Sequence, residues 1–224
     1  MSDKYTECMS TRVQVTGIVD AVAAELRALV LAGELVPGRA VTEAIVAERF
    51  SVARPSAKAA IEKLVAEGLL ERSAHRSARV PKLDAEAVLD VYATRRRIES
   101  SALHELATRR LAPTAARAAN AEIAALATRA PELIVDPDMR FHAAIVDALE
   151  SPRTSRAYSS LLGEVRLCMA QVQGQRLISV ELIHREHAEV LDALEAGDEN
   201  RAIEVLSAHL GRAGERLAEE ARIR

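Results

Sequence analysis

Four side chains in the second half of the sequence have the types and spacing of metal ligands. Asp138 and His142 lie four residues apart in D-M-R-F-H, which places both on one face of a helix. His187 and His209 follow in two later segments with helical apolar spacing. If those helices face one another, three imidazoles and one carboxylate converge, a set that suits zinc, manganese or nickel. Separate hydrogen-bonded histidines would leave the same pattern, so spacing alone leaves both interpretations open.

The other three histidines have different predicted positions. His184 lies three residues before His187, so we expect it beside the ligands or in solvent. His75 falls in a basic turn, and His104 is expected at the surface. The predicted ligand set therefore contains three of the six histidines.

A second segment with functional spacing covers residues 50–68, F-S-V-A-R-P-S-A-K-A-A-I-E-K-L-V-A-E-G. Its apolar residues recur at helical intervals, and its first turn holds Arg54, Pro55, Ser56 and Lys58. A helix that opens with small polar and basic residues can enter a DNA major groove, where arginine binds guanine edges or phosphate. The alternative is an ordinary amphipathic helix with solvated cations.

The segments before it predict a helix-turn-helix. Residues 16–31 have helical apolar spacing, with Thr16 as the N-cap. A turn at Pro37-Gly38 leads to a short helix over residues 42–50 that begins at Thr42. The side chains of this short helix that we expect to face inward are Ile45, Val46 and Phe50.

After the third helix the sequence predicts a basic hairpin. Residues 69–72 and 78–80 can pair as two short strands around a turn at residues 73–77. Cations on such a ribbon, beside a recognition helix, reach phosphate or the minor groove. The basic side chains of this predicted wing are Arg72, His75, Arg76 and Arg79.

The rest of the chain contains only helical patterns. We expect helices over residues 84–110, 114–129, from Asp136 or Asp138 to 149, 152–172, 178–196 and 199–220. The predicted fold is mainly α: a winged helix-turn-helix over residues 1–80, ordered from about residue 12, and an all-α antiparallel bundle over residues 84–224.

Composition limits the classes of protein. Hydrophobic residues make up 49% of the 224 and aromatic residues 2%, which favours closely packed helices. A net charge of −3 restricts any nucleic-acid surface to a local patch. Cys8 and Cys168 lack metal-knuckle spacing, and neither a signal peptide nor a membrane span is evident. We therefore expect a cytoplasmic protein with reduced thiols and no membrane partner.

Residues 26–80 resemble the winged helix-turn-helix of GntR-type bacterial transcription regulators. The resemblance implies that Arg54 and Lys58 contact DNA from the recognition helix and Arg76 from the wing, with Ser56 and His75 beside them. The features that carry it are Leu26, Gly33, Pro37-Gly38, Glu43, Val52, Arg54, Lys58 and Leu64…Glu67-Gly68-Leu69. The departures, which bear on the operator sequence rather than on the fold, are Ala44, Ala53, Pro55-Ser56, Ala59 and Ser77.

Residues 84–215 resemble FCD, the ligand-binding domain of the FadR-like branch of the same family. Its metal signature is an Asp and a His four apart, a His opening a later helix and a His on the last helix. Arg95, in R-R-R-I-E, matches the family's inward arginine and would pair with a small carboxylate effector. The resemblance implies a divalent transition metal, zinc before manganese or nickel, on the matching residues Asp138, His142, His187 and His209.

The combined prediction is a DNA-binding transcriptional regulator, a repressor of a metabolic operon, controlled by a small organic acid bound near the metal. It would bind a near-palindromic operator as a homodimer. A metalloenzyme is one alternative, because such a site can activate water. We expect no enzyme, since no H-E-x-x-H occurs and residues 184–187 read H-R-E-H. A regulator that responds to metal alone is the other alternative.

Overall fold

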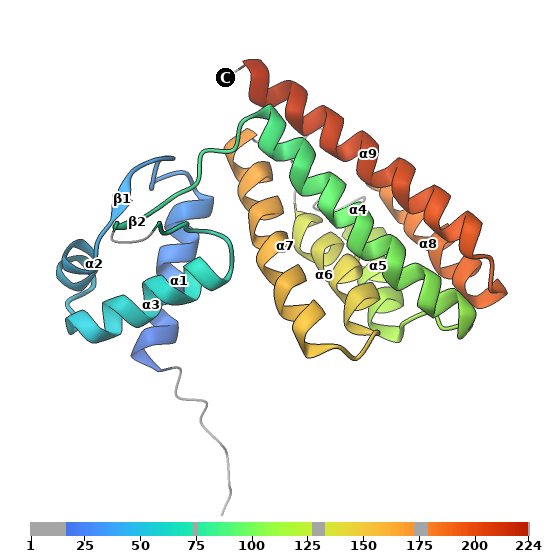
Figure 1. Ribbon diagram of the computed structural model, residues 1–224, viewed down its shortest axis with the longest axis horizontal. Helices are drawn as coiled ribbons and strands as arrows, with labels where there is room; N and C mark the ends of the chain where they lie inside the picture. Colours follow the sequence, from blue (N-terminus) through green and yellow to red (C-terminus); the bar gives the residue numbers. More distant parts are fainter. Residues whose placement is uncertain (1–16, 74–75, 127–132, 173–178, 224) are drawn as a thin grey trace, which may run out of the picture.

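The computed structural model describes residues 17–73, 76–126, 133–172 and 179–223. Figure 1 shows a small N-terminal part of short helices beside a bundle of longer helices, with the chain crossing between them just before α4. A two-stranded sheet lies in the N-terminal part, and the remaining described elements are helices. The predicted fold class, a winged helix-turn-helix followed by a helical bundle, is confirmed.

The N-terminal part is built around three helices. α1 (Ile18–Leu31) packs on α3 (Arg54–Ala66), and α2 (Glu43–Phe50) precedes α3 across a short turn. The Thr42 hydroxyl accepts a hydrogen bond of 3.2 Å from the Ile45 backbone N–H, so Thr42 caps α2 as predicted. Ser51 ends α2 with a left-handed backbone (φ 52°), which directs the chain into α3.

Two details of these helices differ from the sequence prediction. Ile45 is 50% exposed, although it was expected to face inward. α2 is only two turns long, so Val46 and its one-turn neighbour Phe50 cover the core and leave Ile45 about 100° away around the helix. The N-cap of α1 is Gly17, and the predicted cap Thr16 lies outside the described residues.

The sheet of the wing also differs from the predicted hairpin. β2 (Ala78–Arg79) pairs antiparallel with β1 (Ala40–Val41), a strand that the sequence analysis did not predict. Residues 69–72 contribute a single bridge, in which Glu71 and Arg79 exchange backbone hydrogen bonds of 2.9 and 3.0 Å. Leu69 and Leu70 are buried in the core beneath, so this segment turns inward instead of extending as a strand.

The helices of the bundle begin and end with recognisable caps. Asp84 accepts a hydrogen bond of 2.9 Å from the Ala87 N–H, Ser179 caps α8, and Gly197 ends α8 with φ 75°. Within the described residues the bundle consists of α4 (Ala85–Thr108), α5 (Thr114–Leu126), α6 (Val135–Asp147), α7 (Pro152–Val172), α8 (Val180–Ala196) and α9 (Glu199–Ile223).

Two boundaries of the bundle helices bear on the predictions. α6 begins at Val135, before both predicted starts, so Asp136 and Asp138 lie in its first turn, where carboxylates favour the helix dipole. α5 is described as far as Leu126, and the predicted end at residue 129 lies outside the described residues. Asp138 is thereby placed in the first turn of α6, where it is buried.

Close helix packing compensates for the shortage of aromatic side chains. α4 and α9 run side by side along one face of the bundle (Figure 1). A Cβ added at Gly214 of α9 would lie 2.9 Å from the Cβ of Tyr92 on α4, so a glycine permits this approach. Ala, Leu, Val and Ile dominate the buried core, as the composition predicted.

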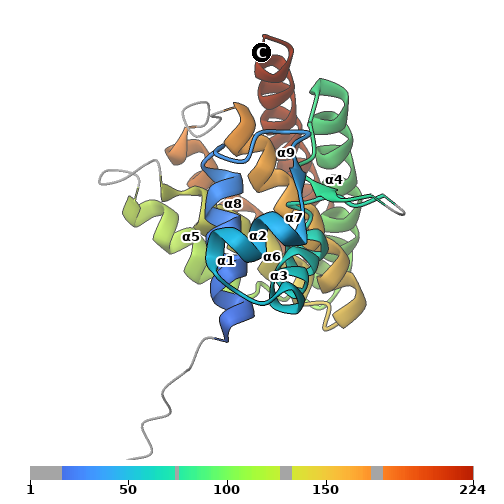
Figure 2. The same ribbon diagram turned by 90° about the vertical axis from the view of Figure 1, so that its left-hand side faces the viewer.

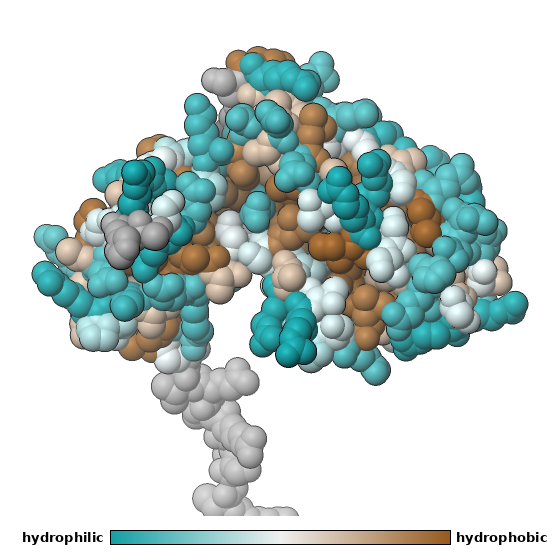
Figure 3. Space-filling view, viewed as in Figure 1, coloured by the Kyte–Doolittle hydropathy of each residue, from teal (hydrophilic) through white to brown (hydrophobic). Residues whose placement is uncertain are grey.

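The surface in Figure 3 is mostly hydrophilic on both parts, with apolar residues showing as separate patches. The same view shows a deep notch between the lower halves of the two parts, which are joined above it. Among the described helices, none has both the length and the apolar character needed to cross a bilayer.

Candidate functional site

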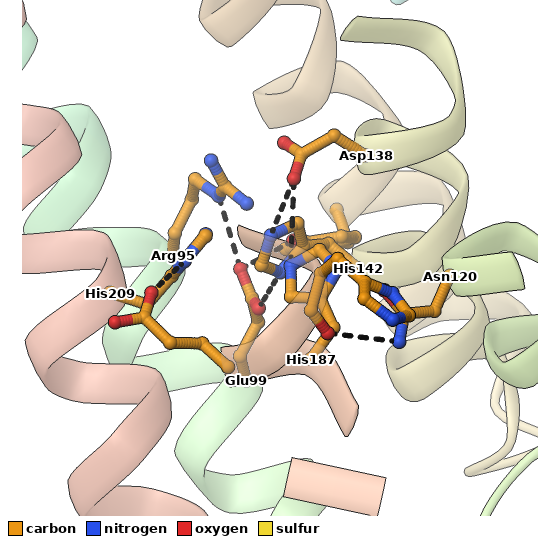
Figure 4. A network of polar contacts seen from close by, with 10 residues as sticks. Arg95, Glu99, Asn120, Asp138, His142, His187 and His209 are labelled. Carbon is orange, nitrogen blue, oxygen red and sulfur yellow. Dashed lines mark hydrogen bonds and ion pairs between the residues drawn. The ribbon is translucent and has the colours of Figure 1, made fainter. Parts of the chain in front are cut away.

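The structure brings the four predicted ligands together inside the bundle. Asp138 and His142 come from α6, His187 from α8 and His209 from α9, and one ligand atom from each lies within 4.8 Å of the others (Figure 4). All four residues are 9% exposed or less. The helices that carry the predicted ligands therefore do converge, a condition that the sequence alone could not establish.

Several ligand atoms in this cluster have no hydrogen-bond partner. They are Asp138 Oδ1, His142 Nε2 and both ring nitrogens of His187. Asp138 Oδ1 lies 3.5 Å from His187 Nε2 and 3.8 Å from His142 Nε2. A buried polar atom without a partner costs about 1–3 kcal/mol, so a group of them facing one another needs an explanation. A zinc-type ion supplies one, because its ligands lie about 3–4 Å apart and are these atom types.

Glu99 of α4 sets the tautomer of His142. Its Oε2 lies 2.6 Å from His142 Nδ1, and the carboxylate is fully buried. A carboxylate can only accept here, so Nδ1 carries the proton and Nε2 presents its lone pair to the cluster. Hydrogen bonding of this kind orients an imidazole for a metal.

Glu186 of α8 has the same relation to His209. Its Oε2 lies 3.0 Å from His209 Nδ1, and Arg212 forms an ion pair with its other oxygen. The third imidazole, His187, stacks on Phe141 with ring centroids 3.6 Å apart and planes 4° from parallel. Each of the three rings is therefore held by a neighbour that leaves a nitrogen directed at the cluster.

The protonation states favour metal binding. Burial lowers the pKa of His142 below its ordinary value despite the nearby Glu99 carboxylate. Burial, followed by the neighbouring His209 and His142, holds the pKa of His187 well below its ordinary value. Burial would raise the pKa of Glu99, but His142 and Arg95 outweigh it and hold that pKa at about 2. Neutral imidazoles are the form in which histidine binds a divalent metal, and an ionised Glu99 can accept the Nδ1 proton of His142.

Arg95 is a buried cation beside the cluster. It is 1% exposed, and its Nε donates a hydrogen bond of 3.0 Å to Glu99 Oε1. Its guanidinium lies 5.1 Å from the centre of the Tyr92 ring, a cation–π distance. One terminal nitrogen, Nη2, is buried without a partner. Glu99 neutralises the charge, and Nη2 keeps a donor available.

A cavity adjoins Arg95, Asp138 and His209. The volume open to water within it is about 30 Å³, which suits roughly two water molecules. Arg212 and Arg216 of α9 form the other charged part of its wall, together with Glu186. The cavity therefore joins the candidate metal ligands to a cationic wall, an arrangement that complements a small anion.

The residues that support the site were not predicted from the sequence. Glu99 is central, and the Tyr158 hydroxyl of α7 donates to its Oε1 at 2.5 Å. Asn120 of α5 holds His184, with 3.2 Å between its Oδ1 and His184 Nδ1. The available signal was the spacing Arg95-x-x-x-Glu99, because an i,i+4 ion pair on a mostly apolar helix suggests a buried partnership.

The predicted DNA-contacting residues that the structure describes lie on α3 and on the wing. Arg54 and Lys58 are exposed in the first half of α3, and Ser56 between them is half-buried. Figure 2 turns this part toward the viewer and shows α2 and α3 in front, with the wing projecting beside them. Arg76 is exposed on the wing, and His75 lies outside the described residues.

A hollow between α3 and the wing gathers cations. Arg54, Arg72 and Arg76 line it together with the first turn of α2. Arg72 is paired with Glu62, because its Nη1 lies 2.5 Å from Glu62 Oε1. The two exposed arginines face this hollow from α3 and from the wing, as a phosphate-binding surface requires.

Comparison with known families agrees with this division of the chain. Residues 18–80 match the family described as bacterial regulatory proteins, gntR family. Residues 90–212, more than half of the chain, match the FCD domain. The chain belongs to the GntR family. It is a DNA-binding transcriptional regulator with an FCD domain, and the families it matches are regulators rather than enzymes, which excludes the metalloenzyme alternative.

Solved structures with the same fold come from several bacteria. A GntR regulator from Rhodococcus sp. RHA1 is 22% identical, covers 90% of this chain and 97% of its own, and superposes with a TM-score of 0.68. McbR/YncC from E. coli is 19% identical with a TM-score of 0.67, covering 91% of this chain and 98% of its own. Lar from Listeria monocytogenes is 18% identical, covers 92% and 97%, and has a TM-score of 0.62. No curated protein matches the chain.

These comparisons bear on the cluster of Asp138 and the three histidines. GntR regulators bind DNA and take a small-molecule effector through the FCD domain, and FCD domains commonly bind a metal ion. The cluster of Asp138 and the three histidines lies within the matched FCD region.

Proposed function

We propose that this regulator holds a divalent transition metal on Asp138, His142, His187 and His209. Zinc suits these ligands best, and manganese or nickel are the alternatives. The observation that carries the proposal is the set of partnerless buried ligand atoms that face one another. When bound, the metal supplies a positive centre to which a small carboxylate can coordinate. Glu99 and Glu186 hold the Nδ1 protons of His142 and His209, which leaves Nε2 of each ring for the metal.

The effector in this proposal is a small organic acid that Arg95 pairs with from the wall of the cavity. The support is the free Nη2 donor and the cationic residues of α9 around the same cavity. The volume open to water is small, about 30 Å³, so we expect an acid that reaches both Arg95 and the metal to displace side chains that line the cavity. An effector that needs this displacement binds two arrangements of the bundle with different affinity, which regulation requires.

The DNA-reading surface in this proposal is the first half of α3 with the wing. We assign residues 1–80 to DNA binding and residues 84–224 to metal and effector binding. The chain would bind a near-palindromic operator as a homodimer and repress a metabolic operon. Arg54 would read a base, and Lys58, Ser56, His75 and Arg76 would hold the backbone.

A selection from bacterial promoter fragments tests the DNA half. The wild type should retain a palindromic fragment at both a low and a high salt concentration. Arg54→Ala should lose ~1–3 kcal/mol of specific affinity, whereas Arg109→Ala, at the exposed C-cap of α4, should bind as the wild type does. Unselective binding that vanishes with salt would refute sequence reading by this surface.

The DNA fragment that the wild type retains is then used to test the proposed effector. Small mono- and dicarboxylates are titrated into the metal-loaded complex of wild type and of Arg95→Lys, which keeps the charge beside Glu99. Release of the wild type by one acid, with a weaker response in the variant, supports the proposal. The small cavity favours a second candidate, a regulator that responds to metal alone. Release by chelation, with no response to any acid, would establish that candidate.

A further inference from the structure

Helix α7 contacts both halves of the molecule. It lies between the N-terminal part and the rest of the bundle, beside α1 on one side and α4, α6 and α9 on the other (Figure 1). Residues 160, 163, 167 and 171 fall within a narrow arc of α7, and Tyr158 projects from the opposite side. The two faces have different partners.

The first face meets the end of α3 backbone to backbone. A Cβ added at Gly163 would overlap the carbonyl oxygen of Glu67, and one added at Gly68 would overlap the carbonyl oxygen of Ser160. A glycine on each side therefore allows the chain after α3 to lie directly on α7. Side chains would separate these two backbones.

The same face continues along α7. Leu167 is fully buried and belongs to the apolar core of the N-terminal part, although its own helix belongs to the bundle. Gln171 holds the connecting segment, since its Nε2 donates to the Pro81 carbonyl at 2.8 Å and its Oε1 accepts from the Leu83 N–H at 3.3 Å. Four consecutive positions of one helix face thus fix the N-terminal part.

The opposite face of α7 reaches the metal and effector site. The Tyr158 hydroxyl donates to Glu99, the carboxylate that also contacts His142 and Arg95. Met169, on the same face, lines the cavity. Any movement of His142 or Arg95 therefore affects Glu99, which is hydrogen-bonded to Tyr158 of α7.

We propose that α7 transmits the state of the site to the DNA-reading helix. This inference rests on the proposed metal site. Occupation of the site fixes His142, which fixes Glu99 and Tyr158, and α7 carries that position to the Gly163–Glu67 contact. α3 has 13 residues, so its Arg54 end lies about 20 Å from this contact and moves farthest when α3 tilts.

Amide hydrogen exchange on the full-length protein tests the transmission, with Zn²⁺ as the probe. Exchange is followed in excess chelator and in saturating Zn²⁺. In the wild type, Zn²⁺ should slow exchange in the bundle and also in α1 and α3, by roughly 5- to 100-fold, the range of ordinary coupling between sites.

Gly163→Ala should abolish the effect of Zn²⁺ on α1 and α3 and retain its effect on α6 and α8. Gly211→Ala is the matched control, because a Cβ there meets nothing within 4 Å; it should behave as the wild type. Gln171→Met preserves size and removes the two hydrogen bonds to the connecting segment. It should weaken the transmission even if Gly163→Ala does not fold.

The outcomes separate this inference from the metal site itself. Slowed exchange in the wild-type bundle without any change in α1 and α3 would overturn the role of α7. An undiminished response of α1 and α3 in Gly163→Ala and in Gln171→Met would overturn it as well. Absence of any Zn²⁺ effect on α6 and α8 in the wild type would refute the metal site, and the inference would fall with it.

Discussion

A single buried carboxylate connects the groups of the candidate site. Glu99 accepts hydrogen bonds from Arg95, His142 and Tyr158, which come from α4, α6 and α7. A charge placed there would be costly without partners, and here every partner is a donor. The charge of Glu99 thereby fixes the orientation of an imidazole, a guanidinium and a phenol together.

Glu99→Gln should lower metal affinity by roughly 10- to 100-fold, the usual effect of losing an outer-shell carboxylate. The amide can present its NH₂ to His142 Nδ1, which favours the tautomer that no longer offers Nε2 to a metal. Competition with a coloured chelator measures the affinity. Glu122→Gln is the control, because Glu122 is exposed and pairs with Arg140. Equal metal affinities in the two variants would show that Glu99 does not orient His142 for the metal.

Cys168 reports on the packing of α7. Its side chain is fully buried, and burial, aided by the Glu164 charge, raises the pKa of its thiol to about 12. The thiolate fraction at pH 8 is then on the order of 10⁻⁴, because each unit below the pKa reduces it tenfold. In a Cys8→Ser background, we expect a thiol reagent to label Cys168 only after unfolding in urea. Rapid labelling of the native protein at pH 8 would show that this face of α7 opens.

At the scale of elements, the contact between α4 and α9 depends on a missing side chain. Gly214 faces the Tyr92 side chain, whereas Gly211, one turn earlier in α9, faces open space. Tyr92 also lies under the Arg95 guanidinium, so a displacement of α4 at this point would reach the cavity.

Gly214→Ala should therefore lower the free energy of unfolding by ~1–3 kcal/mol, the usual cost of overpacking. Gly211→Ala should leave it unchanged or raise it by up to ~1 kcal/mol, since alanine favours helix more than glycine does. Urea denaturation of both variants measures the difference. A Gly214→Ala protein as stable as Gly211→Ala would mean that the α4–α9 approach can relax without cost.

The elements themselves were predictable where local signals were strong. Helical periodicity and caps such as Thr42 and Asp84 located the helices because they act within one or two turns. The partner of β2 was not predictable in the same way. β1 is two residues long and carries no strand pattern, so its pairing comes from tertiary contact with a distant segment.

For the whole molecule, the sequence could supply the types of ligand but not their surroundings. Asp138 and His142 share a helix, so their relation follows from i,i+4 geometry. His187 and His209 converge with them only because the bundle brings the ligand-bearing faces of α6, α8 and α9 to one interior point. Glu99 was missed because two of its three partners, His142 and Tyr158, lie 43 and 59 residues away in the chain. The backbone contact at Gly163 likewise leaves no pattern in the sequence.

The metal content of the purified protein after equilibrium dialysis against zinc tests whether Asp138 and the three histidines form a metal site. We expect a single zinc ion per wild-type chain, and strongly reduced content for His187→Ala and for His209→Ala. His104→Ala, an exposed histidine on α4, should retain the wild-type content. Full zinc content in both ligand variants would contradict the site, and with it the control of DNA binding that we derive from it.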